Sequence, residues 1–420
     1  MKQGVMDAEL PFLPQEIIRN VLIRLPAKSI IRFRCVCKHW KNLFKNPSFI
    51  ADHLHHSRNR NPYLLFQRNG RANPLNLYLL DCEMKVCEFP NAPLIGSLLG
   101  ATIIGSSNGL LCVQIDRNGI YPPSLLLWNP AIREVRQVPR TINDFVGDCR
   151  LGFGYSPVVD DYKIVRSYAN FGGAIDWVEV FSLSTGSWKD IDFGNLGGVK
   201  LFSETVTGSW KDFDFRNILE GAKPWETVNA DGAMFWYGSK LGVEQGRRVD
   251  IDFIVSFDIA TEVFTLIPWP ALNSNSSAKL TVYDNKLAVL SNNMVGDFEY
   301  VIDLWVMEER NGVSGERCSW AKKYSCSQFM YSLNPATIWR NEIVCNVDRP
   351  GFSSFMVGSR LIRETEPEAE DYEPKTHLSL TNLNTKKFRI FSVRRCRHDH
   401  LIFNYVESLV PVGNYHVEEP

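Results

Sequence analysis

Residues 13–26 read LPQEIIRNVLIRLP, and their apolar members recur at the spacing of one helical face. These members are Ile17, Ile18, Val21, Leu22 and Leu25. Pro14 suits the first turn of a helix, where its missing N–H would have no partner, and Pro26 ends the pattern. The stretch therefore predicts an amphipathic helix.

Two more short helices are predicted directly after it. One covers residues 27–33, and the other covers residues 36–44 and is expected to end at Asn46-Pro47. So short a segment cannot bury three apolar faces by itself, because domains of this size are marginal without a metal, disulfides or a partner. We therefore expect another protein to complete it.

From residue 62 onward the pattern changes to short strands separated by Gly, Pro, Asn and Asp. Strand-turn-strand units, interpreted as outer hairpins, lie at 77–90, 125–139, 178–193, 254–268, 301–324 and 378–393. Apolar segments, interpreted as inner strands, lie at 109–113, 151–155, 232–236, 286–290, 342–346 and 405–409. The last of these would pair with the first hairpin and remove the exposed sheet edges of a ring. An open stack of sheets is the alternative.

The predicted fold is thus an α+β chain with two kinds of domain. A small three-helix domain precedes a large all-β domain, for which six repeats favour a six-bladed, kelch-like propeller. The expected boundaries are residues 10–50 for the helical domain, 51–61 for a polar linker and 62–416 for the propeller.

The bulk composition argues against several classes of protein. The chain has 46 Lys and Arg and 47 Asp and Glu, so it lacks the basic excess of a nucleic-acid binder. None of its ten cysteines forms a CxxC pair, and no secretory signal is recognised, which favours a cytoplasmic or nuclear protein with reduced thiols. The most apolar stretch, residues 95–105, is short and broken by Gly and Ser, so no membrane span is expected.

Motifs that could carry chemistry fail on their context. Gly105-Ser106-Ser107-Asn108-Gly109 matches the GxSxG pattern of a nucleophilic serine, but a strand is predicted where that pattern requires a helix. The histidines at 53, 55, 56, 398 and 400 have no carboxylate or cysteine at a confirming spacing. We therefore expect no catalytic residue, no metal and no cofactor.

Two further segments are unusual. TGSWKD occurs at 185–190 and again at 207–212, an offset too short for a blade, and is interpreted as a local duplication. The acidic segment 364–373 is interpreted as a solvated loop, with a specificity loop for a basic partner as the alternative.

The N-terminal motifs resemble a plant F-box. They read Leu13-Pro14-Gln15-Glu16-Ile17-Ile18, Leu25-Pro26-Ala27-Lys28-Ser29 and Arg32-Phe33-Arg34-Cys35-Val36-Cys37-Lys38-His39-Trp40. The remainder resembles the F-box-associated domain of the same plant family. Its matching pieces include Leu127-Trp128-Asn129-Pro130, Gly152-Phe153-Gly154-Tyr155 and Tyr405-Val406-Glu407-Ser408-Leu409. Within that family the chain looks most like the S-locus F-box and S-locus F-box-like branch.

The resemblance implies a non-catalytic substrate-recognition subunit of an SCF-type ubiquitin ligase. Its F-box would dock a Skp-type adaptor and, through it, a cullin and a RING subunit. The β domain would capture a protein for ubiquitination and proteasomal degradation. The adaptor-binding residues implied are Leu13, Pro14, Glu16, Ile17, Ile18, Leu22, Leu25, Pro26, Ser29, Arg32, Phe33, Val36, Cys37 and Trp40.

The basic residues between 28 and 45 have two interpretations. Skp-type adaptors are acidic, so a basic face would steer their docking. A helix-turn-helix that reads DNA is the alternative, which the neutral chain disfavours.

Two alternative functions follow from the same sequence. The S-locus branch implies a pollen determinant of self-incompatibility that recognises a secreted-type ribonuclease taken up into the cytosol. A propeller enzyme in the manner of kelch-type oxidases would instead need Tyr, His and Cys side chains near the propeller axis, and the scattered histidines do not favour this.

Overall fold

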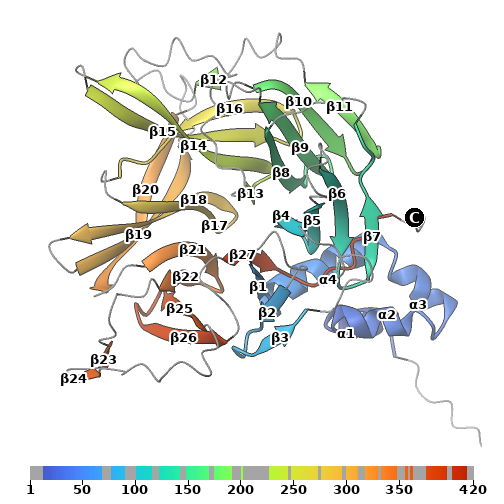
Figure 1. Cartoon of the computed structure of the whole chain (residues 1–420). Coiled ribbons are helices and arrows are strands. Elements are labelled where there is room, and N and C mark those ends of the chain that lie inside the picture. Colours follow the sequence, from blue (N-terminus) through green and yellow to red (C-terminus); the bar gives the residue numbers. More distant parts are fainter. Residues whose placement is uncertain are drawn as a thin grey trace, which may run out of the picture.

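The structure is a computed structural model of the 420-residue chain. It describes residues 13–68, 77–89, 101–115, 123–141, 148–169, 175–191, 200–201, 227–244, 247–272, 276–295, 299–310, 317–329, 333–347, 355–357, 360–362, 375–394 and 400–413. Within these ranges, four N-terminal helices are followed by antiparallel sheets arranged in a ring (Figure 1). The predicted fold class, a small helical domain followed by a six-bladed propeller, is confirmed.

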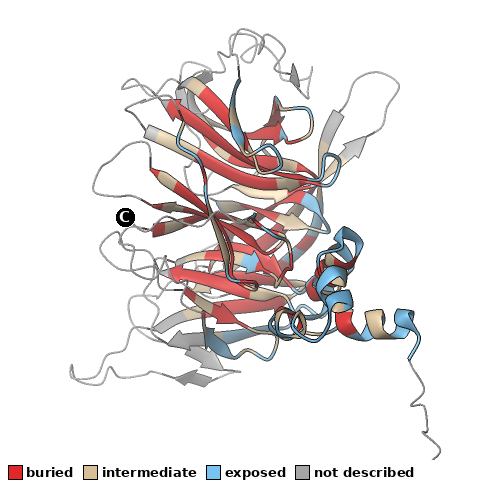
Figure 2. Cartoon of the chain, turned by 90° about the vertical axis from the view of Figure 1, so that its right-hand side faces the viewer, coloured by how far each residue is buried: buried red, intermediate tan, exposed pale blue. Residues whose placement is uncertain are grey.

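The helical domain contains α1 (Gln15–Ile23), α2 (Ala27–Phe33), α3 (Lys38–Leu43) and α4 (Pro47–Arg60). Pro14 and Pro26 directly precede α1 and α2, and their carbonyl groups accept the first helical hydrogen bonds. Figure 2 shows the helices on one side of the propeller, with their outer faces exposed.

Helix α4 is not expected from the sequence. Asn46-Pro47 ends one helix but also begins the next, because the Asn46 side chain accepts a hydrogen bond of 2.9 Å from the Ser48 N–H and Pro47 occupies the first turn. Residues 51–60, expected as part of a polar linker, are therefore helical. They bury His53 and Leu54 against the rest of the domain.

Each blade is an antiparallel sheet whose strands follow one another from the propeller axis outward. In that order, blade 1 contains β27 (His400–Tyr405), β1 (Tyr63–Arg68), β2 (Leu77–Leu80) and β3 (Val86–Glu88). Blade 2 contains β4 (Ala101–Ser107), β5 (Leu110–Ile115), β6 (Ser124–Asn129) and β7 (Glu134–Gln137). Blade 3 contains β8 (Asp148–Ser156), β9 (Asp161–Ala169), β10 (Ile175–Ser182) and β11 (Ser187–Ile191).

The other half of the ring is built in the same way. Blade 4 contains β13 (Val228–Ala230), β14 (Ala233–Glu244), β15 (Arg247–Asp258) and β16 (Val263–Pro268), with β12 (Lys200–Leu201) added in parallel at the outer edge. Blade 5 contains β17 (Ser277–Tyr283), β18 (Lys286–Val295), β19 (Glu299–Arg310) and β20 (Arg317–Phe329). Blade 6 contains β21 (Leu333–Trp339), β22 (Glu342–Val347), β25 (Lys375–Asn382) and β26 (Phe388–Arg394). A separate hairpin joins β23 (Phe355–Val357) to β24 (Arg360–Ile362).

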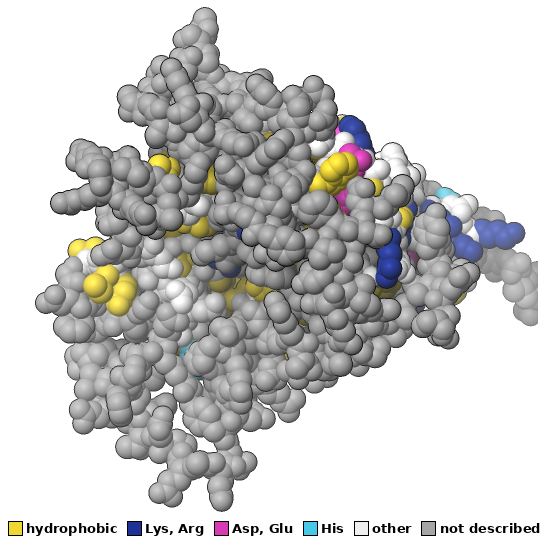
Figure 3. All heavy atoms as spheres, turned by 45° about the horizontal axis from the view of Figure 1, so that its top comes forward, with side chains coloured by type: hydrophobic (Ala, Val, Ile, Leu, Met, Phe, Trp, Pro, Cys, Tyr) yellow, Lys and Arg dark blue, Asp and Glu magenta, His cyan; other side chains and the backbone are white. Residues whose placement is uncertain are grey.

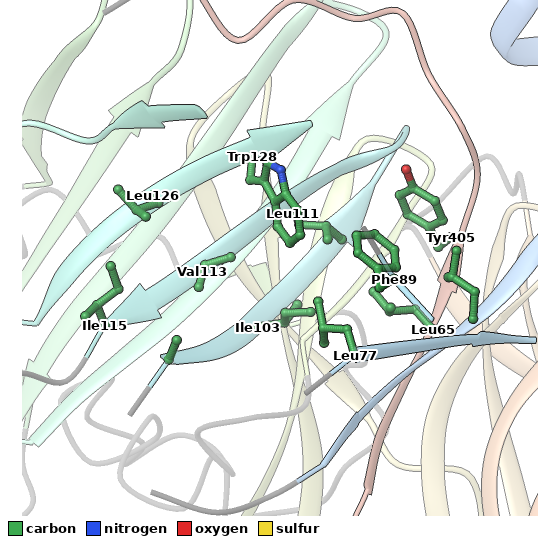
Figure 4. Close-up of a cluster of buried hydrophobic side chains, with 12 residues drawn as sticks. Leu65, Leu77, Phe89, Ile103, Leu111, Val113, Ile115, Leu126, Trp128 and Tyr405 are labelled. Atoms are coloured by element: carbon green, nitrogen blue, oxygen red, sulfur yellow. The ribbon is translucent and has the colours of Figure 1, made fainter. Parts of the chain in front are cut away.

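The ring closes through the two ends of the propeller sequence. Strand β27 pairs antiparallel with β1 over six residues, from Tyr63 opposite Tyr405 to Arg68 opposite His400. This pairing confirms the predicted closure between the C-terminal strand and the first blade, and it excludes the open stack. Figure 4 shows the core that this closure completes between blades 1 and 2, where Leu65 and Tyr405 face Leu111 and Trp128.

All six predicted outer hairpins are confirmed, but most of the predicted inner strands lie one position further out. Only 151–155 lies in an innermost strand, β8. Four of the segments lie in or lead into second strands, namely 109–113, 232–236, 286–290 and 342–346. The last segment, 405–409, continues from the end of β27. The second strands are the more apolar ones because neighbouring blades cover both of their faces, as in β5, where Leu110 to Val113 are all buried.

The two unusual segments lie mostly outside the described residues. The first TGSWKD copy forms the β10–β11 turn and most of β11. The second copy and the acidic segment 364–373 fall outside the described ranges.

Candidate functional site

The helical domain shares its core with the propeller. The buried helical residues of this shared core are Leu22, Ala27, Ile30, Phe44 and Phe49. Ile132, from the β6–β7 turn, and Leu409, which follows β27, belong to the same cluster. The domain is therefore completed partly from within the chain, whereas its short sequence alone suggests completion by another protein.

The apolar face of α1 divides into two. Leu22 is 2% exposed and Ile18 and Leu25 are partly buried against the domain core. In α1, Ile17 and Val21 lie four residues apart and remain 46% and 53% exposed, and Leu13, which precedes the helix and Pro14, is 59% exposed. We call these three residues the α1 stripe; beyond α2, Val36 is also 61% exposed. Large apolar side chains at helical spacing on an exterior surface indicate a face that a partner covers.

The predicted adaptor-binding residues fall into three groups by exposure. Those exposed are Leu13, Pro14, Glu16, Ile17, Pro26, Arg32, Val36 and Cys37. Those partly buried are Ile18, Leu25, Ser29, Phe33 and Trp40, and Leu22 is buried. The exposed group can contact a partner directly, whereas Leu22 can only support the helix from inside. Val21 is absent from the predicted set, although its place four residues after Ile17 could have identified it.

Basic side chains are also exposed on the helical domain. Lys28, Arg32, Lys38, Lys41 and Lys45 are exposed, and Arg34 is partly buried. In Figure 3, Lys and Arg side chains appear on the side of the molecule that carries the helices, whereas much of this view shows residues outside the described ranges. The helical domain thus exposes an apolar stripe and, between residues 28 and 45, several basic side chains, which suit an acidic partner.

Glu407 connects the propeller to the first turn of α2. Its Oε2 accepts a hydrogen bond of 3.1 Å from the Ala27 N–H, one of the helical donors that has no partner within the helix. Burial raises the pKa of Glu407, although the hydrogen bond from Ala27 and the nearby charge of Lys28 act in the opposite direction. The contact fixes the start of α2 against the propeller.

A buried histidine fixes α4 against the end of α1. His53 Nε2 lies 3.0 Å from the carbonyl oxygen of Leu25, and because a carbonyl only accepts, this nitrogen carries the proton. Burial lowers the pKa of His53, so the neutral ring is favoured. Further along α4, the guanidinium of Arg58 donates to the side chain of Asn108 in the β4–β5 turn.

The residues that follow β27 bind both domains. We call residues 406–413 the C-terminal strap. The Asn129 amide donates to the carbonyl oxygens of Ser408 and Val410, at 3.1 and 2.8 Å, while Leu409 enters the helical core. The sequence-based prediction of an inner strand at 405–409 is wrong beyond Tyr405, where β27 ends.

The alternative sites gain no support from the described residues. Ser107 lies in β4, and the strand β5 follows its turn as predicted. Its hydroxyl donates to the side-chain oxygen of Asn229, 3.4 Å away, so its partner is an amide and not the histidine that would activate a nucleophile. Within the described ranges, no group of three or more His, Cys, Asp or Glu side chains could hold a metal ion. His398 lies outside these ranges. None of the described helices has the length and apolar character needed to cross a membrane.

Comparison with known proteins agrees with this architecture. The family model for the F-box associated beta propeller domain matches residues 87–334, more than half of the chain, and the F-box domain model matches residues 10–52. Among the solved structures that are similar, that of YjhT has a TM-score of 0.35 and 13% identity, and covers 78% of this chain and 94% of its own. A likeness at that level says nothing about function.

Curated relatives from Arabidopsis thaliana cover most of both chains. F-box protein CPR1 is 28% identical over 334 residues, which cover 74% of this chain and 72% of CPR1. Protein SUPPRESSOR OF NIM1 1 is 27% identical over 333 residues, covering 75% and 80%. An F-box/kelch-repeat protein is 24% identical over 363 residues, covering 82% and 87%. The chain therefore belongs to the F-box associated beta propeller family, with an F-box domain ahead of the propeller.

Proposed function

We propose that the chain is the substrate-recognition subunit of an SCF-type ubiquitin ligase. The observation that carries the proposal is the exposed α1 stripe of Leu13, Ile17 and Val21, on a helical domain whose exposed residues between 28 and 45 are basic or uncharged. Buried apolar anchors dominate the affinity of protein interfaces, and basic surroundings steer an acidic partner such as a Skp-type adaptor.

In this proposal the predicted F-box residues have two roles. Leu13, Pro14, Ile17 and Val36, together with Val21, contact the adaptor, and Leu22 holds α1 in place from the domain interior. The adaptor connects the chain to a cullin and a RING subunit, and the propeller presents a protein substrate, in the cytoplasm or nucleus. The chain itself supplies no catalytic group. We assign the adaptor-binding role to the F-box at 10–50 and the substrate-binding role to the propeller at 62–416. Residues 51–61, which are mostly helical, connect the two.

The experiment that tests the proposal is co-expression of the full chain with a Skp-type adaptor, followed by affinity purification. An Ile17→Asp/Val21→Asp variant places two charges on the stripe and is expected to abolish the complex. The matched control is Met294→Asp/Val295→Asp, at the end of β18 in blade 5, where the two side chains are 57% and 50% exposed. This control is expected to bind as the wild type does.

Two outcomes would refute the proposal. If the wild-type chain does not co-purify with the adaptor, the receptor role is wrong. If the Ile17→Asp/Val21→Asp variant binds unchanged while its circular dichroism matches the wild type, the α1 stripe is not the docking surface.

A further inference from the structure

A basic cavity opens on the surface of the helical domain, beside its connection to the propeller. Its lining is Arg24, at the end of α1, and His55, His56, Asn59, Arg60 and Asn61, at the end of α4, around a volume of about 500 Å³. Helices α1 and α4 are in contact, so residues far apart in sequence reach the same cavity (Figure 1). None of these lining residues belongs to the α1 stripe.

The cavity gathers positive charge without an acidic lining residue. Partial burial and then the charges of Arg60, Arg24 and His55 lower the pKa of His56, which places these groups within electrostatic reach of one another. Among the described residues, neither Arg24 nor Arg60 has an ion-pair partner. The dipole at the C-terminus of α4 stabilises a cation such as Arg60. It does not account for the presence of Arg24, which follows α1, in the same cavity.

The propeller fixes the backbone beneath the cavity. The Cys82 thiol lies 3.7 Å from the carbonyl oxygen of Arg60 and 3.3 Å from that of Pro62. Arg340, in the β21–β22 turn, donates a hydrogen bond of 2.8 Å to the carbonyl oxygen of Cys82. Because blades 1 and 6 hold the segment in place, a ligand would not have to order it on binding.

We propose that this basic cavity binds a small phosphate-bearing ligand, with Arg24 and Arg60 binding its phosphate oxygens. Guanidinium groups present paired N–H donors that match phosphate, and the amides of Asn59 and Asn61 add neutral donors. The volume lies in the range of small-molecule sites. Arg24 and Arg60 carry two positive charges, more than one carboxylate neutralises, which favours a diphosphate group over a carboxylate.

The histidines give the proposed site a pH dependence of defined sign. An anion in the cavity favours the protonated form of His56, so binding strengthens as the pH falls through the lowered pKa of this histidine. The titratable or charged groups near His56 are Arg24, directly after α1, and His53, His55 and Arg60 from its own helix. None of them is acidic, so none opposes this direction.

The test is calorimetric titration of the full chain, alone and in complex with the adaptor, using pyrophosphate, inorganic phosphate and acetate as probes. Pyrophosphate is expected to bind best and acetate not at all. Arg24→Gln/Arg60→Gln is expected to weaken pyrophosphate binding by about tenfold or more per charge removed, and His56→Gln is expected to reduce its pH dependence. Both arginines are exposed, so the fold should survive, as circular dichroism will check.

The matched control removes the same charge elsewhere. Lys286→Gln/Lys387→Gln changes two exposed propeller residues and is expected to leave pyrophosphate binding unchanged. Equal weakening by both double variants, or binding no tighter than about 1 mM in the free chain, would overturn the proposal. The proposal would also be overturned if the complex with the adaptor did not bind pyrophosphate and Arg24→Gln/Arg60→Gln bound the adaptor more weakly. The cavity would then be part of the adaptor-binding surface. The free-chain titration does not depend on the proposed receptor role.

Discussion

The carboxylate of Glu407 accepts a hydrogen bond from the backbone N–H of Ala27, a residue 380 positions earlier in the chain. The bond joins the segment after the last propeller strand to the first turn of an F-box helix. Together with the packing of Leu409 in the helical core, this bond fixes the position of the F-box relative to the propeller. In the proposed receptor, this contact would hold the adaptor-binding and substrate-binding surfaces at a fixed separation.

Glu407→Ala is expected to destabilise the helical domain by about 1 kcal/mol, because the Ala27 N–H loses its acceptor. Glu407→Gln keeps an acceptor and removes the charge, so it should unfold at a temperature no lower than the wild type at neutral pH. The raised pKa of Glu407 fixes the sign: its favourable contribution is complete below the ordinary value of 4.5 and is lost as the pH rises through the folded value. Thermal unfolding across this pH range should show the melting temperature of Glu407→Gln rising relative to that of the wild type as the pH rises. A difference in melting temperature that does not change with pH would contradict the raised pKa.

His53 predicts the opposite pH dependence for the packing of α4 on α1. Its lowered pKa means that the stability it contributes is complete above the ordinary value of 6.5 and is lost as the pH falls through the folded value. Protonation would place a second N–H at Nδ1, which is buried and has no partner among the described residues. His53→Gln should remove this acid sensitivity and the exposed His55→Gln should not, as monitored by hydrogen exchange of α4.

Leu409→Ala is expected to destabilise the helical domain by about 2–4 kcal/mol, because it opens a cavity in a core that the strap completes. Val412→Ala is the comparison, since Val412 is equally buried but packs in the core between blades 2 and 3. Hydrogen exchange resolved by segment should show faster exchange in the helices for Leu409→Ala and in those blades for Val412→Ala. The same exchange pattern from both variants would disprove a separate role for Leu409.

Gly109→Ala is expected to displace the C-terminal strap. An added Cβ would lie 2.3 Å from Ser408 Cβ, at a backbone φ of +82° that already disfavours a side chain. Gly413→Ala is a matched control, because its φ is +83° but its nearest neighbour would be the Arg136 guanidinium at 3.4 Å. Chemical denaturation should show Gly109→Ala less stable than Gly413→Ala by about 1–3 kcal/mol; equal stabilities would mean that the strap is not tightly packed.

The blades could be predicted from the sequence because their outer hairpins have clear turns between apolar strands. The order of strands within a blade could not be derived in the same way, since an apolar run such as Leu110 to Val113 indicates burial but not distance from the axis. The innermost strand β13 has only three residues, Val228 to Ala230, too few for any periodic signal.

The candidate site shows a similar division. The spacing of Ile17, Val21 and Leu22 predicts a helix, but it does not reveal which side faces the domain core and which faces outward. Helix α4 escapes prediction because residues 51–60 are mostly polar, although the Asn46-Pro47 start is visible. The bond between Ala27 and Glu407 joins residues so distant that only the folded ring brings them together.

The pairing of β27 with β1 also determines when the protein can finish folding during translation. A nascent chain that has emerged up to residue 399 contains every element of the F-box, yet lacks both the innermost strand of blade 1 and the Leu409 side chain of the helical core. The unpaired β1 would then present an open edge to other chains. A premature stop codon ahead of residue 400 is therefore expected to disrupt the proposed adaptor-binding and substrate-binding surfaces together, and to leave an aggregation-prone product.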